Sequence, residues 1–110
     1  MALSLLSFSA LATHNCVGDV NNVAIAAGGN VHVNIGSMGE GNVICNTGAM
    51  SGEYTPEACK AALSMLLSAK MAKKKVRLYF RNDSNTSCQK GSWKNFGSSA
   101  YQLYYIRLEG

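Results

Sequence analysis

The stretch TPEACKAALSMLLSAKMAKKKVRLYF, residues 55–80, contains a complete predicted helix and the strand that follows it. Thr55 offers a hydroxyl for the N-cap, Pro56 suits the first helical position, and Glu57 lies near the positive end of the helix dipole. We therefore predict a helix from this point to about Ala72. Its apolar side chains share one broad face, which consists of Ala58, Cys59, Ala62, Leu63, Met65, Leu66 and Ala69.

Two groups of helix residues lie outside this apolar face. Leu67 and Met71 are four residues apart on the border of the polar side, where they either edge the core or form a subunit interface. Lys73, Lys74 and Lys75 come at the end of the helix, where positive charge complements the helix dipole and the chain turns toward a sheet. The lysine run thus has a structural explanation that needs no ligand.

Strand patterns precede and follow the helix. Residues 76–81 alternate between apolar and polar side chains, which predicts a strand with one buried and one solvated face. Residues 22–36 predict a β-hairpin around a Gly28-Gly29-Asn30 turn, and residues 43–45 a short third strand. A tyrosine-rich strand is expected at residues 100–108. We predict an α+β domain, a five-stranded antiparallel OB-fold-like barrel with one helix between strands 3 and 4.

The chain of 110 residues has room for one domain, which we place at residues 13–110. Residues 1–12, MALSLLSFSALA, are apolar and end in a small-x-small pattern, which predicts a signal-peptide remnant without its charged start; the alternative is a short packed strand or helix. No other apolar run approaches the length of a membrane span. We expect a secreted or periplasmic protein, and the net charge of +4 favours anionic partners only modestly.

Four cysteines in a small exported chain predict two disulfides, and their spacing from the two histidines argues against a metal site. Three pairings are possible. Because Cys45 ends the third strand and Cys88 follows the fourth, both at the margin of the sheet, we prefer Cys45 with Cys88. Cys16 would then pair with Cys59 in the first turn of the helix.

Catalysis has little support in the sequence. With both disulfides formed no thiol nucleophile remains, no phosphate-binding or nucleophile-elbow motif occurs, and the carboxylates are scattered. We predict no enzyme activity and no cofactor. Binding is better supported, because aromatic and cationic residues gather in the last third of the chain and can stack on sugars or bases. The candidate ligand-binding residues are Arg77, Tyr79, Phe80, Arg81, Trp93 and Lys94.

The helix, the basic turn and the strand VRLYF, residues 76–80, together resemble the B subunits of bacterial toxins with five B subunits, especially the subtilase cytotoxin type and, in layout, the heat-labile enterotoxin type. The chain is also similar to small secreted bacterial proteins that share its CNTG segment at residues 45–48. The resemblance implies an exported OB-fold, a pentameric ring and binding to cell-surface glycans. Phe80, Asn22 and Ala26 stand where the subtilase type has a glycan-contacting tyrosine, an acid and a serine.

Our functional prediction is a secreted, non-catalytic binding module that recognises a cell-surface glycan or a protein receptor and forms a homo-oligomer, a pentamer if it is toxin-like. The alternative is a secreted protein-interaction or inhibitor domain. A third hypothesis, an OB-fold for single-stranded nucleic acid, predicts steep salt dependence but conflicts with export. Asn82 and Asn85 each begin a glycosylation sequon.

Overall fold

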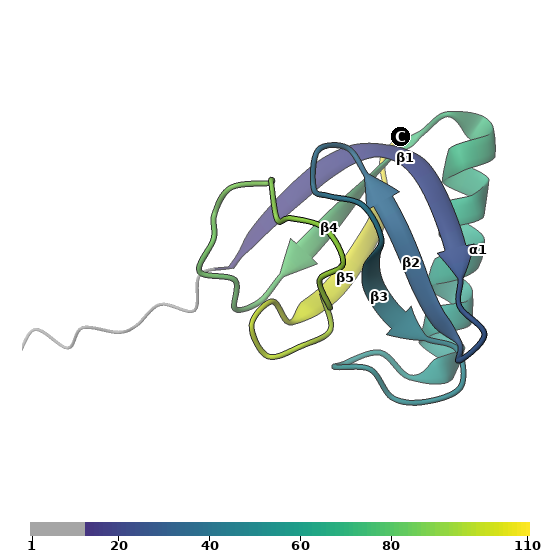
Figure 1. Ribbon diagram of the computed structural model, residues 1–110. Coiled ribbons are helices and arrows are strands. Elements are labelled where there is room, and N and C mark those ends of the chain that lie inside the picture. Colours follow the sequence, from purple (N-terminus) through teal and green to yellow (C-terminus); the bar gives the residue numbers. More distant parts are fainter. Residues whose placement is uncertain (1–12) are drawn as a thin grey trace, which may run out of the picture.

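The computed structural model describes residues 13–110, so the predicted signal-peptide remnant at residues 1–12 lies outside the described residues. The elements follow one another in the order β1 (His14–Ile25), β2 (Asn30–Ile35), β3 (Asn42–Asn46), α1 (Pro56–Ala72), β4 (Lys75–Phe80) and β5 (Leu103–Leu108) (Figure 1). The predicted order of three strands, one helix and two strands is confirmed, and the chain belongs to the α+β class.

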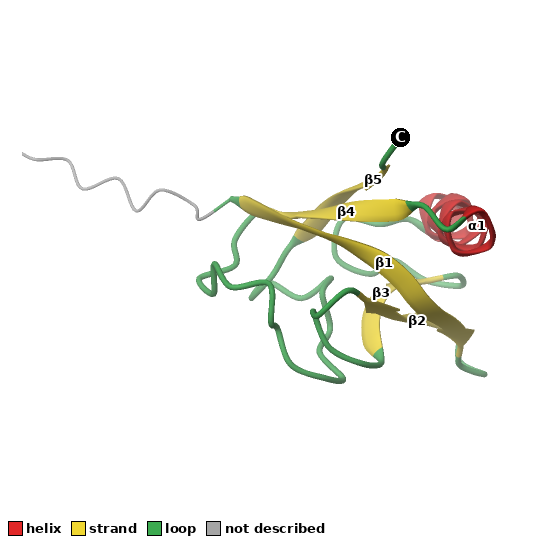
Figure 2. Ribbon diagram, turned by 90° about the horizontal axis from the view of Figure 1, so that it is seen from above, coloured by secondary structure: helices red, strands yellow, loops and turns green. Residues whose placement is uncertain are grey.

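All neighbouring strands are antiparallel, in the order β3-β2-β1-β4-β5. The central strand, β1, has 12 residues and serves two partners: residues 14–19 pair with β4, whereas residues 20–25 pair with β2. The ladder with β2 is irregular between Val20 and Asn22, close to the change of partner, and β1 curves there (Figure 2). At this point the backbone of β1 lies close to Gly36, which follows β2. Position 18 therefore requires glycine, because a Cβ there would lie 2.6 Å from the Cα of Gly36.

β1 begins earlier than the sequence predicted, at His14 in place of residue 22. Cys16, Gly18 and Val20 form its buried side, in the period of two that a strand requires. A glycine in the middle of this row weakens the apolar alternation, so the sequence pattern predicts a strand only from residue 22 onward. The last strand is shorter than predicted, since residues before Leu103 form turns.

A short segment of chain bridges the two outer strands, β3 and β5. Val43 receives a 2.8 Å hydrogen bond at its carbonyl from the amide of Phe96 and donates one of 2.8 Å to the carbonyl of Lys94. The amide of Leu103, at the start of β5, donates to the carbonyl of Phe96 at 2.9 Å. Residues 94–96 thus connect β3 with the beginning of β5, while the rest of β5 forms an edge of the sheet.

The helix begins and ends as the sequence predicted. The hydroxyl of Thr55 accepts a 3.1 Å hydrogen bond from the amide of Ala58, and Lys73 closes the helix in the left-handed conformation. Its buried residues all belong to the predicted apolar face, although Ala58 is exposed. Leu67 and Met71 are exposed, so they do not edge the core that residues 13–110 form. Among residues 13–110, no helix is long and apolar enough to span a membrane.

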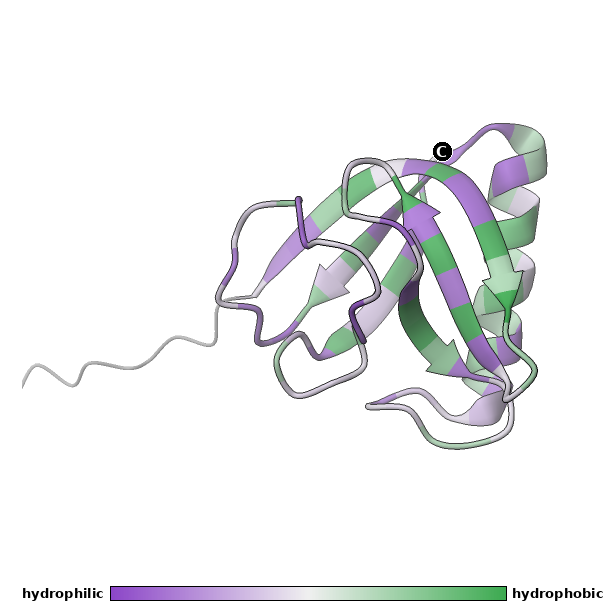
Figure 3. Ribbon diagram, viewed as in Figure 1, coloured by the Kyte–Doolittle hydropathy of each residue, from purple (hydrophilic) through white to green (hydrophobic). Residues whose placement is uncertain are grey.

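The core lies between the inner face of the sheet and α1. In β2 and β4 every second residue is buried, which produces the alternating bands of Figure 3. Phe80 and Phe96 meet edge to face with their ring centroids 5.1 Å apart, so the bridging segment is part of the same core as the strands.

Two disulfides are present, as predicted, but the preferred pairing is wrong. Cys16 pairs with Cys88 and Cys45 pairs with Cys59. Cys45 and Cys88 do not share a margin of the sheet, because β2 and β1 lie between β3 and β4. The start of α1 packs on β3 instead, which brings Cys59 to Cys45, and the segment after β4 folds back over β1.

We expect the two disulfides to differ in their contributions to stability. Cys16–Cys88 spans a sequence separation of 72 residues and Cys45–Cys59 one of 14. Chain entropy predicts that the paired replacement Cys16→Ala/Cys88→Ala lowers the free energy of unfolding by about 4 kcal/mol, against about 3 kcal/mol for Cys45→Ala/Cys59→Ala. Urea unfolding followed by circular dichroism measures both, and peptide mapping without reduction checks the pairing. An equal or reversed order would contradict the entropic account.

Candidate functional site

Trp93 is the most exposed aromatic side chain of the described residues, at 70% of its surface, although it sits in a tightly bonded segment. Its backbone has φ +60°, a left-handed conformation that side-chain-bearing residues seldom adopt. The amide of Trp93 donates a 2.8 Å hydrogen bond to the carbonyl of Glu40, which anchors this conformation. The large apolar ring is therefore held at the surface by its backbone.

The loop between β2 and β3 provides the platform for Trp93. A Cβ at Gly41 would lie 2.4 Å from the indole ring, so the ring rests directly against the glycine backbone. His32, in β2, approaches the indole edge to face with 5.8 Å between the centroids, and its Nδ1 lies 2.7 Å from the carbonyl oxygen of Gly41. A glycine with positive φ and a bonded histidine thus position the ring.

The two loops are joined at several further points. The amide of Lys90 donates to the carbonyl of Met38 at 3.0 Å, and the buried side chain of Asn42 accepts from the amide of Lys94 at 2.7 Å. The amide of Glu40 donates to the hydroxyl of Ser92 at 3.2 Å. These bonds hold the Trp93 segment in one arrangement before any ligand arrives.

A shallow hollow of about 430 Å³ opens beside the indole. Its apolar wall comes from the end of β1, where Ile25 is exposed, and its polar groups are Asn22, His32 and Glu40. An apolar wall with a few polar groups is the usual composition of a small-ligand site. Within the described residues we call this hollow the Trp93 groove; it is lined by Asn22, Ala24, Ile25, Ala26, His32, Glu40, Gly41 and Trp93.

The structure separates the residues that the sequence grouped as one site. Arg77 and Tyr79 lie on the outer face of β4, as the alternation predicted, and Arg81 directly follows the strand. None of the three lines the Trp93 groove. Lys94 is exposed but is also absent from the lining. Trp93 is therefore the single member of the predicted set that belongs to the groove.

Phe80 is not a ligand-contacting residue. Its ring is completely buried and contacts the rings of His14, Phe96 and Tyr101. It occupies the inward side of β4 together with Leu78, as the period of two requires. The prediction that this ring meets a sugar, as the tyrosine does in the toxin subunits that the chain resembles, is wrong.

On the outer face of β4 and β5, tyrosine rings pack against one another and against arginines, whose charges are paired with Glu53 and Glu109. Tyr79 and Tyr105 meet edge to face at 5.2 Å, and the guanidinium of Arg81 lies 4.2 Å above the ring of Tyr104. Hydrogen bonds from Arg77 and Arg107 hold the pKa of the Glu109 carboxyl below its ordinary value. On this face the arginines already have partners, so they are less available to an anionic ligand.

Nearby, burial raises the pKa of the Tyr54 hydroxyl to about 12, with a smaller contribution from the charge of Glu53. Glu53 also accepts two hydrogen bonds from Arg81, at 2.9 and 3.1 Å. Tyr54 therefore stays neutral over the physiological range and packs against the core beside the start of α1.

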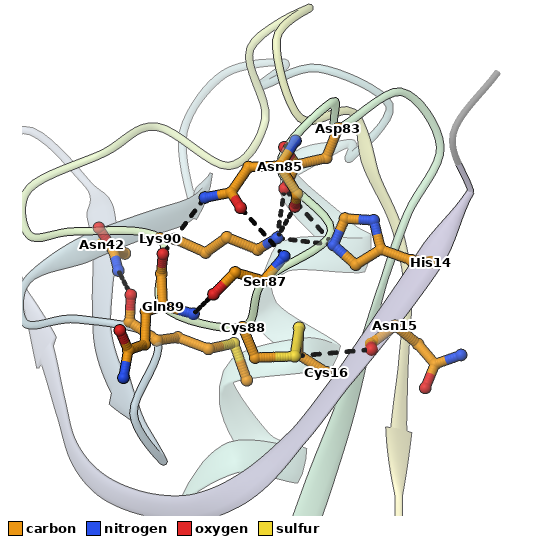
Figure 4. A network of polar contacts seen from close by, with 11 residues as sticks. His14, Asn15, Cys16, Asn42, Asp83, Asn85, Ser87, Cys88, Gln89 and Lys90 are labelled. Carbon is orange, nitrogen blue, oxygen red and sulfur yellow. Dashed lines mark hydrogen bonds and ion pairs between the residues drawn. A yellow bond between two sulfur atoms is a disulfide. The ribbon is translucent and has the colours of Figure 1, made fainter.

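A buried ionic cluster fixes the segment after β4 to the start of β1 (Figure 4). The side chain of Lys90 is 0% exposed, and its Nζ lies 2.6 Å from Oδ2 of Asp83, 2.6 Å from Nε2 of His14 and 2.5 Å from the carbonyl oxygen of Asn85. The contacts with His14 and with the Asn85 carbonyl are hydrogen bonds, whereas the contact with Asp83 is an ion pair. Among the described residues, Oδ2 of Asp83 and Nδ1 of His14 are buried without a hydrogen-bond partner. Cys88, two residues earlier in the chain, is bonded to Cys16 in β1, so the cluster and the disulfide act at the same place.

Sequence reasoning missed this cluster because Lys90 and Asp83 lie in an aperiodic segment, where lysine and aspartate are usually solvated. The groove residues His32 and Glu40 were missed as well, since they come from β2 and the loop after it. Asn22 and Ala26, which also line the groove, were connected with a sugar site only through the resemblance to the subtilase type. In residues 13–110, no group of three or more histidines, cysteines or acidic residues could hold a metal ion.

Comparisons with protein-family models, with curated proteins and with solved structures found no match for this chain. The resemblance to toxin B subunits therefore stays a prediction.

We expect Gly41→Ala to displace the indole of Trp93, because the new methyl group would overlap the ring and φ at this position is +70°. The emission maximum of Trp93, which is the single tryptophan of the chain, should shift, and the free energy of unfolding should fall by about 1–3 kcal/mol. Gly28→Ala is the matched control, since no atom lies within 4 Å of a Cβ there. Identical spectra for the two variants would contradict this geometry.

The buried cluster predicts a non-additive double-mutant cycle. Asp83→Ala should cost about 3 kcal/mol or more, because it leaves the buried ammonium of Lys90 without a counter-charge. Asp83→Ala/Lys90→Met should recover a large part of this loss, since no unpaired charge remains. Urea unfolding of both single variants and the double variant measures the coupling. A double variant as unstable as the sum of the singles would show that the pair is not coupled.

Proposed function

We propose that this chain is an exported, non-catalytic module that binds a carbohydrate in the Trp93 groove. The observation that carries the proposal is the 70% exposed indole, fixed by its own backbone over a hollow with polar groups. A sugar ring presents a patch of C–H groups that can lie on an aromatic face, surrounded by hydroxyls that need hydrogen-bond partners. The groove provides both kinds of contact in one small area.

The polar groups suit hydroxyl recognition. When Nδ1 of His32 donates to the carbonyl of Gly41, Nε2 is left as an acceptor for a hydroxyl. The amide of Asn22 can donate and accept, and the carboxylate of Glu40 accepts from two neighbouring hydroxyls. Among the lining residues Glu40 brings the one full charge, and it is negative. We therefore propose a neutral or amino sugar as the ligand in place of an acidic one.

We further propose that the fold is an OB-fold barrel and that the protein is exported to an oxidising compartment. The strand order β3-β2-β1-β4-β5 is that of an OB-fold barrel opened between β3 and β5, and residues 94–96 bridge this opening. Two disulfides support an oxidising compartment, hence export. Assembly into a homo-oligomer, with five subunits if the chain is toxin-like, would multiply a weak sugar contact through avidity.

The test is glycan binding by the full chain and by Trp93→Ala. A glycan array should show binding to neutral or amino sugars, and titration of the bound sugar should change the fluorescence of Trp93, the single tryptophan. Trp93→Ala should lose at least tenfold in affinity, as expected for a stacking contact of about 1–3 kcal/mol. Tyr105→Ala, on the face of β4 and β5, is the control and should bind normally. Unchanged binding by Trp93→Ala, or no binding to any glycan, would refute the proposal.

A second candidate is a protein-interaction surface on β4 and β5. Its support is the row of half-buried or exposed tyrosines and arginines on β4 and the edge strand β5, since both residue types are enriched at protein interfaces. This alternative predicts that Tyr105→Ala weakens a co-purifying complex whereas Trp93→Ala does not, the reverse of the result expected for carbohydrate binding.

A further inference from the structure

The solvent face of α1 carries two large apolar side chains with nothing over them in the described chain. Met71 is 86% exposed and Leu67 is 46% exposed. They are four residues apart and therefore lie one above the other on the helix, opposite the buried row that contains Leu66 and Ala69. An exposed apolar pair of this size on the solvated side of the helix calls for an explanation outside the core.

Beside these side chains lies most of the net charge of the protein. Lys70, Lys73, Lys74 and Lys75 with Asp19 give this end of α1 a net charge of +3, out of a formal +4 for the whole chain. A hollow of about 390 Å³ separates the helix end from β1 and is lined by three of these lysines. Charge is thus concentrated at one end of the molecule, away from the long segment between β4 and β5 (Figures 1 and 2).

Most of this positive charge is not neutralised. Lys75 pairs with Asp19 at 3.1 Å, and Nζ of Lys70 donates to the carbonyl of Asn21 at 2.8 Å, which leaves its charge in place. Among residues 13–110, no carboxylate lies within ion-pair distance of Lys73 or Lys74. Two free ammonium groups therefore stand next to the exposed Met71.

We propose that this surface, the helix-end patch of Leu67, Lys70, Met71, Lys73 and Lys74, docks on a membrane rich in anionic lipids. Exposed apolar side chains between lysines are the composition of helices that lie in the membrane interface. The lysines would lie over anionic headgroups, while Met71 and Leu67 enter the boundary between headgroups and acyl chains.

The two other possible occupants fit less well. A second copy of the chain placed symmetrically on this face would bring two groups of charge +3 together, which opposes association. A soluble polyanion, such as a sulfated polysaccharide, would use the lysines but would leave the exposure of Met71 and Leu67 without a purpose. An anionic membrane explains the charge and the apolar side chains together. This inference is independent of the proposed sugar site, since the two sets of residues do not overlap.

The test is co-sedimentation of the full chain with vesicles of phosphatidylcholine alone and of phosphatidylcholine mixed with phosphatidylglycerol. Binding should be stronger to the anionic vesicles and should weaken as salt rises from about 50 to 500 mM, because the attraction is screened. Lys73→Gln/Lys74→Gln should reduce the partition coefficient on anionic vesicles about tenfold or more, and Leu67→Ser/Met71→Ser about fivefold. All variants keep the apolar residues 1–12, so differences among them report the helix-end patch.

The matched control is Thr86→Glu/Ser99→Glu, which lowers the net charge by the same two units at exposed positions between β4 and β5. It should bind anionic vesicles much more strongly than Lys73→Gln/Lys74→Gln. Equal loss in both double variants would reduce the effect to net charge and overturn the proposal. So would heparin binding without vesicle binding, a dimer in solution that Leu67→Ser/Met71→Ser abolishes, or no preference for anionic vesicles at low salt.

Discussion

The attachment of the segment between β4 and β5 to the start of β1 is the constraint on which the Trp93 groove depends. That segment has no helix or strand of its own. Holding it in one conformation costs conformational entropy, which contacts with the rest of the protein must offset. The disulfide between Cys16 and Cys88 and the buried ammonium of Lys90 hold it at almost the same point of the chain. The disulfide is a covalent link. The ion pair of Lys90 is costly to break because a buried charge would be left without its partner.

Further contacts fix the rest of this segment, including Trp93, as far as the core. Backbone hydrogen bonds join the segment to the loop after β2, and Phe96 then enters the core against Phe80. Trp93 lies between these two anchored parts, with a backbone conformation that few residues adopt. An exposed ring of this size leaves apolar surface in contact with water, yet many contacts fix it at the surface, and this is the observation on which the proposed sugar site rests.

The charged groups of the molecule divide into two kinds. On the outer face of β4 and β5, arginines are paired with Glu53 and Glu109 and lie over tyrosine rings, so their charges are already balanced within this face. At the end of α1 the lysines have few partners and surround exposed apolar side chains. Free charge, and hence long-range attraction, is therefore concentrated at the helix-end patch.

The sequence alone determined the order of the strands and the helix, and the bounds of α1 almost to the residue. These signals are local: the N-cap at Thr55, the proline after it and the alternation in β4 act between residues close in the chain. Only the tertiary structure decided how the cysteines pair, that Phe80 and Lys90 are buried, and that Trp93 meets His32 and Gly41. Each of these depends on which strands are neighbours in the sheet and on where an aperiodic segment folds back, and no local pattern of residues contains that information.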